Sequence, residues 1–178
     1  MWYRTIVAKK YTSVIAALWL KDKDAKKLVL SEDDVKDGSC EPQDNLHITL
    51  LYIGKADDLE NKKDLIKTAI ENFAKKSKPV SGVVGGVGCF NGDENGRPFY
   101  ASFDSSDLND MVQGLSSTME SLGIELDKTH GFTPHITLAY LDPETEIPQI
   151  ELSNQKIKFD QITLAWAGDK FHYDLSQG

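Results

Sequence analysis

One six-residue pattern occurs twice in the sequence, and this repeat restricts the possible folds more than any other feature. The copies are His-Ile-Thr-Leu-Leu-Tyr at residues 47–52 and His-Ile-Thr-Leu-Ala-Tyr at residues 135–140, so five of six positions agree. Each copy lies in a strand-like segment of a corresponding half of the chain, and a predicted helix lies upstream of the second copy. A repeat in this context predicts a molecule with two similar halves.

The side chains of a strand alternate between its two faces, which determines what each copy presents. His47 and Thr49 should project together from the first strand, and His135 and Thr137 from the second. The opposite, apolar face of each strand should lie in the core, and it is expected to include the two motif tyrosines, Tyr52 and Tyr140.

Two such strands in a pseudo-twofold arrangement would form a pocket with two imidazoles and two hydroxyls. One imidazole can act as general base on the attacking oxygen while the other, protonated, donates to the leaving oxygen. The hydroxyls can donate hydrogen bonds to the non-bridging oxygens where negative charge collects. The repeat therefore predicts a metal-independent phosphodiesterase with His47, Thr49, His135 and Thr137 as catalytic residues. The alternative is a non-catalytic protein that only sequesters nucleotides, but binding alone does not need two imidazoles.

The pattern of apolar residues and turn residues predicts an α+β fold. Two helices are expected, at 57–76 and 107–122, and residues 21–45 should form a loop with at most a turn of helix. Strands are expected at residues 13–20, 46–53, 80–90, 97–103, 134–141, 156–167 and 171–175. A chain of 178 residues suits a single bilobal domain over 1–178.

The net charge of −8 and the pI near 5.0 limit the class of partner. Proteins that grip long nucleic acids usually present a basic face. This chain has only two arginines, Arg4 and Arg97, so a small nucleotide is the expected ligand and a long nucleic acid is not. The apolar run 14–20 is too short to span a membrane, which favours a cytoplasmic protein without a membrane partner. The oligomeric state stays open.

Several other side chains are candidates for substrate binding. Phe132 and Trp166 are the best candidates to stack on a base, ahead of Trp19 and Tyr100, although packing is the commoner role of such a ring. His130 is either a pocket residue or a loop residue, and Arg97 is either a phosphate ligand or a surface side chain. No third ligand stands at a useful spacing from His130 and His135, so no metal site and no cofactor are expected.

At the two His-x-Thr motifs the sequence resembles the 2H phosphoesterase superfamily, which includes 2′-5′ RNA ligases and 2′,3′-cyclic nucleotide phosphodiesterases. The segments 85–88, 130–140 and 162–166 are similar to its phage and bacterial 2′-5′ RNA ligase branch. The resemblance covers about residues 14–175 and implies two lobes of antiparallel sheet, with helices outside and a central active-site groove. Phage relatives include anti-CBASS nucleases, which destroy cyclic-oligonucleotide signals in the host cytoplasm. The substrates left open are 2′,3′-cyclic phosphates, 2′-5′ linkages and cyclic oligonucleotides.

Overall fold

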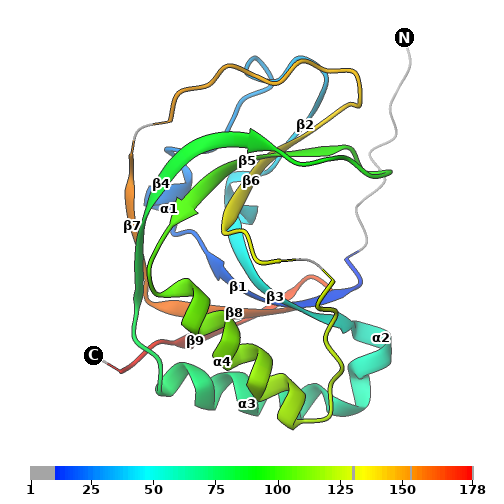
Figure 1. Ribbon diagram of the computed structural model, residues 1–178, viewed down its shortest axis with the longest axis vertical. Coiled ribbons are helices and arrows are strands. Elements are labelled where there is room, and N and C mark those ends of the chain that lie inside the picture. Colours follow the sequence, from blue (N-terminus) through cyan, green and yellow to red (C-terminus); the bar gives the residue numbers. More distant parts are fainter. Residues whose placement is uncertain (1–10, 130, 153, 178) are drawn as a thin grey trace.

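The computed structural model describes residues 11–129, 131–152 and 154–177, which form two antiparallel sheets (Figure 1). The four-stranded sheet has the order β3 (His47–Lys55), β1 (Ser13–Trp19), β8 (Gln161–Trp166) and β9 (Asp169–Asp174). The five-stranded sheet has the order β2 (Gly38–Cys40), β6 (His135–Leu141), β5 (Arg97–Asp104), β4 (Val80–Cys89) and β7 (Lys156–Phe159). The predicted α+β fold with two antiparallel sheets is confirmed.

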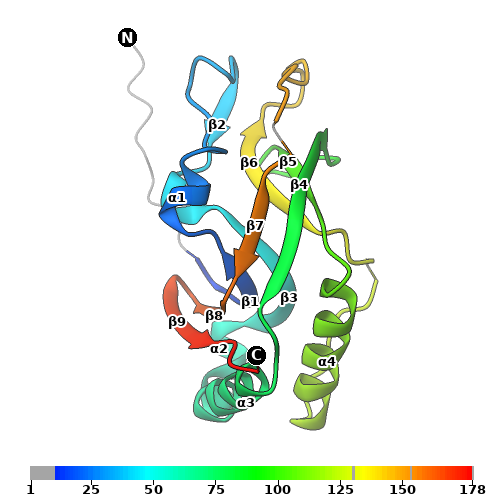
Figure 2. The ribbon, with the colours of Figure 1, turned by 90° about the vertical axis from the view of Figure 1, so that its left-hand side faces the viewer.

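Two long helices, α3 (Lys63–Lys75) and α4 (Leu108–Ser121), lie at the same end of the molecule (Figure 2). Helix α3 packs against β8 and β9, while α4 contacts α3 and β3. The predicted loop 21–45 contains the short helix α1 (Asp22–Ala25), strand β2 and a 3-10 turn, η1 (Gln43–Asn45). Among the described residues, no helix is long and apolar enough to cross a membrane.

The single helix expected over 57–76 is divided into α2 (Ala56–Leu59), a 3-10 turn, η2 (Glu60–Lys62), and α3. The backbone leaves helical geometry at Leu59 and at Lys62, each with φ of −110°. The Lys62 ammonium donates to the carbonyls of Leu122 and Gly123 at 3.0 and 3.4 Å. Leu122 is the C-cap residue of α4, so this lysine satisfies a carbonyl that the helix itself leaves unpaired.

The strand expected over 156–167 is two strands that belong to different sheets. Residues before Asp160 form β7 at the edge of the five-stranded sheet, and residues after it form β8 inside the four-stranded sheet. The carboxylate of Asp160 pairs with the ammonium of Lys21, which lowers the pKa of the Asp160 carboxyl below its ordinary value. The chain thus crosses from one sheet to the other at a residue tied by an ion pair.

A single cluster of buried apolar side chains joins both sheets and both long helices. Leu18 and Ile48 contribute from the four-stranded sheet, Phe99 and Leu138 from the five-stranded sheet, and Ile70 from α3; each is fully buried. Because the two sheets share this core, the strands that carry the two His-x-Thr motifs have fixed positions relative to each other.

Candidate active site

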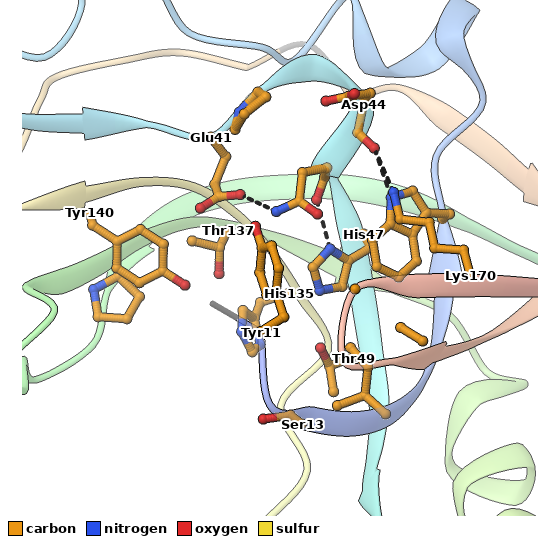
Figure 3. A pocket seen from close by; sticks show the side chains of 17 residues that line it. Tyr11, Ser13, Glu41, Asp44, His47, Thr49, His135, Thr137, Tyr140 and Lys170 are labelled. Carbon is orange, nitrogen blue, oxygen red and sulfur yellow. Dashed lines mark hydrogen bonds between the residues drawn. The ribbon is translucent and has the colours of Figure 1, made fainter. Parts of the chain in front are cut away.

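The two motif strands, β3 and β6, contact each other where the sheets meet, and both motifs line the same cavity of about 580 Å³. Figure 3 shows His47 and Thr49 reaching this cavity from β3, and His135 and Thr137 from β6. The structure therefore brings together the four side chains that the repeat singled out. Their catalytic roles remain predictions.

A β-bulge interrupts each motif strand at the same position. In β3 the pairing with β1 skips Leu50, because Ala16 and Ala17 oppose Leu51 and Thr49. In β6 the pairing with β5 skips Leu138, because Phe99 and Tyr100 oppose Ala139 and Thr137. A bulge inserts one residue into a strand and shifts the alternation of side chains beyond it. The motif leucines, Leu50 and Leu138, are thus equivalent in geometry as well as in sequence.

The bulge corrects the expectation that both motif tyrosines lie in the core on the face opposite the histidines. Leu138 and Ala139 are consecutive and both fully buried, so Tyr140 returns to the face of Thr137 and lines the cavity. Burial, followed by the charge of Glu41, raises the pKa of the Tyr140 phenol. Tyr52 follows a similar bulge in β3, but its side chain is 46% exposed and does not line the cavity.

Each histidine is oriented by the backbone carbonyl two residues before it. His47 Nδ1 lies 2.6 Å from the carbonyl oxygen of Asn45, and His135 Nδ1 lies 2.6 Å from that of Thr133. A carbonyl oxygen only accepts hydrogen bonds, so Nδ1 carries the proton and donates in both rings. The Nε2 atom is then the one that exchanges protons with a bound substrate. The two imidazoles have matching tautomers and matching supports.

The rings around the two histidines differ. Trp19, weighed above as a platform for a base, stacks on His47 with the ring centroids 4.2 Å apart and an interplanar angle of 17°. The Lys170 ammonium lies 4.3 Å from the centre of the same indole. The carbonyl oxygen of Asp44 accepts from Trp19 Nε1 at 2.9 Å and from Lys170 at 3.3 Å. Trp19 is thus a support for His47, positioned on its own strand beside β3.

His135 instead meets aromatic rings edge to face. Phe90 lies 4.8 Å and Tyr100 5.4 Å from the imidazole, measured between ring centroids. These two rings stack on each other at 4.3 Å. Tyr100 therefore supports a catalytic candidate in place of stacking on a base. Edge contacts of this kind fix the plane of the His135 ring.

One wall of the cavity is acidic. The carboxylate of Glu41 accepts from Asn45 Nδ2 at 2.5 Å, and the carbonyl of the same Asn45 supports His47 (Figure 3). Burial and then the charges of Glu41 and Asp44 raise the pKa of Tyr11, another side chain of the cavity. Among the described residues that line the cavity, Lys170 alone carries an ammonium group.

Of the substrate-binding candidates among the described residues, Trp19 lines the cavity, whereas Trp166, Phe132 and Arg97 do not. Trp166 is 3% exposed and lies beneath Lys63 of α3, since its neighbour Ala165 takes the cavity face of β8. Phe132 packs against the hydrophobic core. The guanidinium of Arg97 donates to the carbonyls of Asp142 and Thr145, which directs it away from a phosphate in the cavity. His130 lies outside the described residues.

Sequence reasoning missed several residues of the cavity, namely Tyr11, Glu41, Asp44 and Lys170. None of them belongs to the repeat, and each lies in a loop or near a turn, where periodicity gives no orientation. Tyr140 belongs to the repeat, but only the bulge places it on the cavity side. No group of three or more potential metal ligands comes together within the described part of the chain.

Comparison with known proteins identifies the family. Residues 19–174 match the family model described as AKAP7 2′5′ RNA ligase-like domain. No curated protein sequence matches the chain significantly. The fold resembles TT0787 of Thermus thermophilus, with a TM-score of 0.76 and 19% identity over 92% of this chain and 98% of that one.

Two further solved structures share the fold. Escherichia coli LigT complexed with 3′-AMP has a TM-score of 0.65 and 18% identity over 93% of this chain and 96% of that one. Kluyveromyces marxianus Usb1 has a TM-score of 0.56 and 13% identity over 95% of this chain and all of that one. With a family model that matches almost its full length and two His-x-Thr motifs on one cavity, the chain belongs to the AKAP7 2′5′ RNA ligase-like family of the 2H phosphoesterase superfamily.

Proposed function

We propose that this protein cleaves phosphodiester bonds of small nucleotides without a metal ion, using His47 and His135 as the acid and base. The observation that carries the proposal is the matched support of the two rings. Both rings donate from Nδ1 to a carbonyl oxygen, and both line the same cavity. In each ring, Nε2 is therefore the atom left to exchange a proton with a ligand in that cavity. An acid and a base on one cavity supply the two proton transfers that phosphodiester cleavage needs.

In the proposed reaction, one neutral imidazole takes the proton of the attacking hydroxyl through Nε2. The other imidazole, protonated, gives its Nε2 proton to the leaving oxygen, so the pair exchanges protonation states in one turnover. Thr49 and Thr137 lie beside the histidines and donate hydrogen bonds to the non-bridging oxygens, where the transition state gathers charge.

The proposed substrate is a small nucleotide: a 2′,3′-cyclic phosphate, a 2′-5′ linkage or a cyclic oligonucleotide signal, the last implying an anti-CBASS role in a host cytoplasm. The cavity volume of about 580 Å³ falls in the range of small-molecule sites. The net charge of −8 disfavours long nucleic acids. LigT of similar fold has been crystallised with 3′-AMP, ATP and NADP⁺, which supports a nucleotide ligand here.

The test is incubation with 2′,3′-cyclic mononucleotides, 2′-5′ oligoadenylate and cyclic di- and trinucleotides in EDTA, followed by chromatography. We expect turnover of at least one class by the wild-type protein and about 10²- to 10⁴-fold slower turnover by His135→Ala, because that variant lacks one half of the acid/base pair. Binding without turnover by the wild-type protein would support the sequestering alternative, and turnover that requires added divalent metal would contradict the metal-free mechanism.

A further inference from the structure

The carboxylate of Glu41 occupies a wall of a cavity that is proposed to hold an anionic phosphate. The Glu41 N–H donates to the carbonyl of Leu138, the bulge residue of β6, at 2.8 Å. Its carboxylate is held at 2.5 Å by Asn45 Nδ2. Backbone and side chain are both anchored, so the carboxylate has a fixed position beside the second motif strand.

The surroundings of Glu41 are aromatic and apolar. Tyr140 and Tyr11 line the same cavity as Glu41. Burial raises the pKa of each phenol, and the charge of Glu41 adds to that rise. Pro42 and Pro98 line the same cavity. Flat rings and prolines around a polar anchor are the surroundings in which proteins hold a nucleobase, stacked and read along its hydrogen-bonding edge.

Besides the two histidines, the charged side chains that line the cavity are Glu41, Asp44 and Lys170. Figure 3 shows Glu41 and Lys170 on opposite sides of His47. A carboxylate repels a phosphate and also the acceptor atoms of a base, so the Glu41 side suits a neutral group that presents hydrogen-bond donors. Lys170 lies on the other side, beside Asp44, and carries the one ammonium group among the described cavity residues that a phosphate could meet.

We propose that Glu41 is a specificity-determining residue that selects guanine, by accepting hydrogen bonds from its N1–H and N2–H₂ groups. Guanine presents these two donors next to each other, and a carboxylate has two acceptor oxygens to meet them. Adenine and cytosine each present an exocyclic amine next to a ring nitrogen that only accepts hydrogen bonds. That nitrogen would face a carboxylate oxygen, which also only accepts. Uracil flanks its single N–H with two carbonyls. The inference rests on the proposed function only in taking a nucleotide as the ligand.

The decisive variant is Glu41→Gln, because the glutamine oxygen can still accept from Asn45 Nδ2. The change therefore keeps the loop that supports His47 and replaces one acceptor with a donor. Asp44→Asn is the matched control, since it removes the same charge from the same cavity without touching Glu41. Circular dichroism checks that both variants are folded.

Two measurements are made on each protein: kcat/KM for the four ribonucleoside 2′,3′-cyclic phosphates, and Kd for the four ribonucleoside 3′-monophosphates by calorimetry. We expect the wild type to favour guanosine by about 10- to 100-fold, the range of a two-bond base contact. Glu41→Gln should lose that preference through weaker guanosine binding, with the other bases changed less than about threefold. Asp44→Asn should keep the preference.

Equal wild-type affinity for all four bases, no binding of any, or a uniform effect of Glu41→Gln would overturn the inference. Calorimetry separates this failure from failure of the proposed function. Guanosine-selective binding without turnover of any substrate would support the proposed role of Glu41 and contradict the proposed phosphodiesterase activity.

Discussion

At the scale of single residues, the two histidines are equivalent in support and different in surroundings. Each ring donates from Nδ1 to a carbonyl two residues earlier. His47 then stacks face to face on Trp19, whereas His135 meets Phe90 and Tyr100 at their edges. The shared support explains how one repeated tetrapeptide produces two rings with the same tautomer. The different neighbours distinguish the two rings of the proposed acid/base pair.

Replacing either histidine should abolish most of the activity. We expect His47→Ala and His135→Ala each to lower kcat by about 10²- to 10⁴-fold, since each removes one of the two proton transfers. The double variant should be little worse than either single variant, because the two residues act as a unit. Single-turnover kinetics on the best substrate measure the effect. Near wild-type turnover by either single variant would show that the acid/base assignment is wrong.

The threonines provide the matched comparison within the same motifs. Thr49→Val and Thr137→Val keep the shape of the side chain and remove the hydroxyl, so their effects should be milder than those of the neighbouring histidines. A threonine variant slower than its histidine variant would mean that the hydroxyl has another role.

At the scale of elements, the turn between β8 and β9 contains a residue that does not favour the conformation it adopts. The β8–β9 hairpin is closed by Ala167 and Gly168 between the paired residues Trp166 and Asp169. Both turn residues have positive φ, 47° and 96°. A two-residue turn with positive φ at both positions favours Asn-Gly, because alanine has no side-chain compensation for the left-handed conformation.

Ala167→Asn should therefore stabilise the protein. We expect the free energy of unfolding in urea to rise by about 0.5–1 kcal/mol, with kcat/KM unchanged because the Ala167 side chain is exposed and does not line the cavity. Gly168→Ala is the opposing control and should lower the free energy of unfolding. A less stable Ala167→Asn variant would contradict the turn assignment.

The elements also show what the sequence can and cannot predict. Strand alternation was enough to place His47 with Thr49 on one face, because the two residues lie before the bulge. It misplaced Tyr140, since a bulge depends on the partner strand β5 and is not visible in the local pattern. It joined β7 and β8, although the apolar positions shift from Ile157 and Phe159 to Ile162 and Leu164, and this break at Asp160 is where the chain passes from one sheet to the other.

At the scale of the whole molecule, the cavity depends on two sheets that keep a fixed relation. The crossing between them at Asp160 is tied to Lys21 by an ion pair whose side chains are each about half exposed. The Arg97 guanidinium, considered from the sequence as either a phosphate ligand or a surface side chain, donates to carbonyls of the 142–145 segment, a contact across 45 or more residues that no local pattern reveals. The residues of the candidate site that belong to the repeat were therefore predictable from the sequence. Those contributed by segments far apart in the chain were not.

The Lys21–Asp160 pair gives a stability effect with a defined pH dependence. The folded pKa of Asp160 is lowered, so its stabilisation is present above the ordinary carboxyl pKa and is lost as pH falls through the folded value. We expect Asp160→Asn to lower the free energy of unfolding at pH 7 by at most about 1 kcal/mol, because the pair is exposed. In urea titrations the difference from wild type should shrink between pH 5 and pH 2. A constant difference over that range would assign the effect to something other than the ion pair.

The proposed mechanism needs one neutral and one protonated imidazole in a single cavity at the same time, and the pH dependence of kcat/KM tests this requirement. Imidazole groups ordinarily titrate near pH 6.5, so the state with one neutral and one protonated ring is most populated around neutrality. The measurement runs from pH 5 to 9 in EDTA at fixed ionic strength, on a substrate that does not titrate in that range. We predict a bell with its maximum at about pH 6–8, whose two arms belong to the histidine pair. A rate that rises steadily through pH 9 would indicate attack by hydroxide and would contradict the two-histidine mechanism.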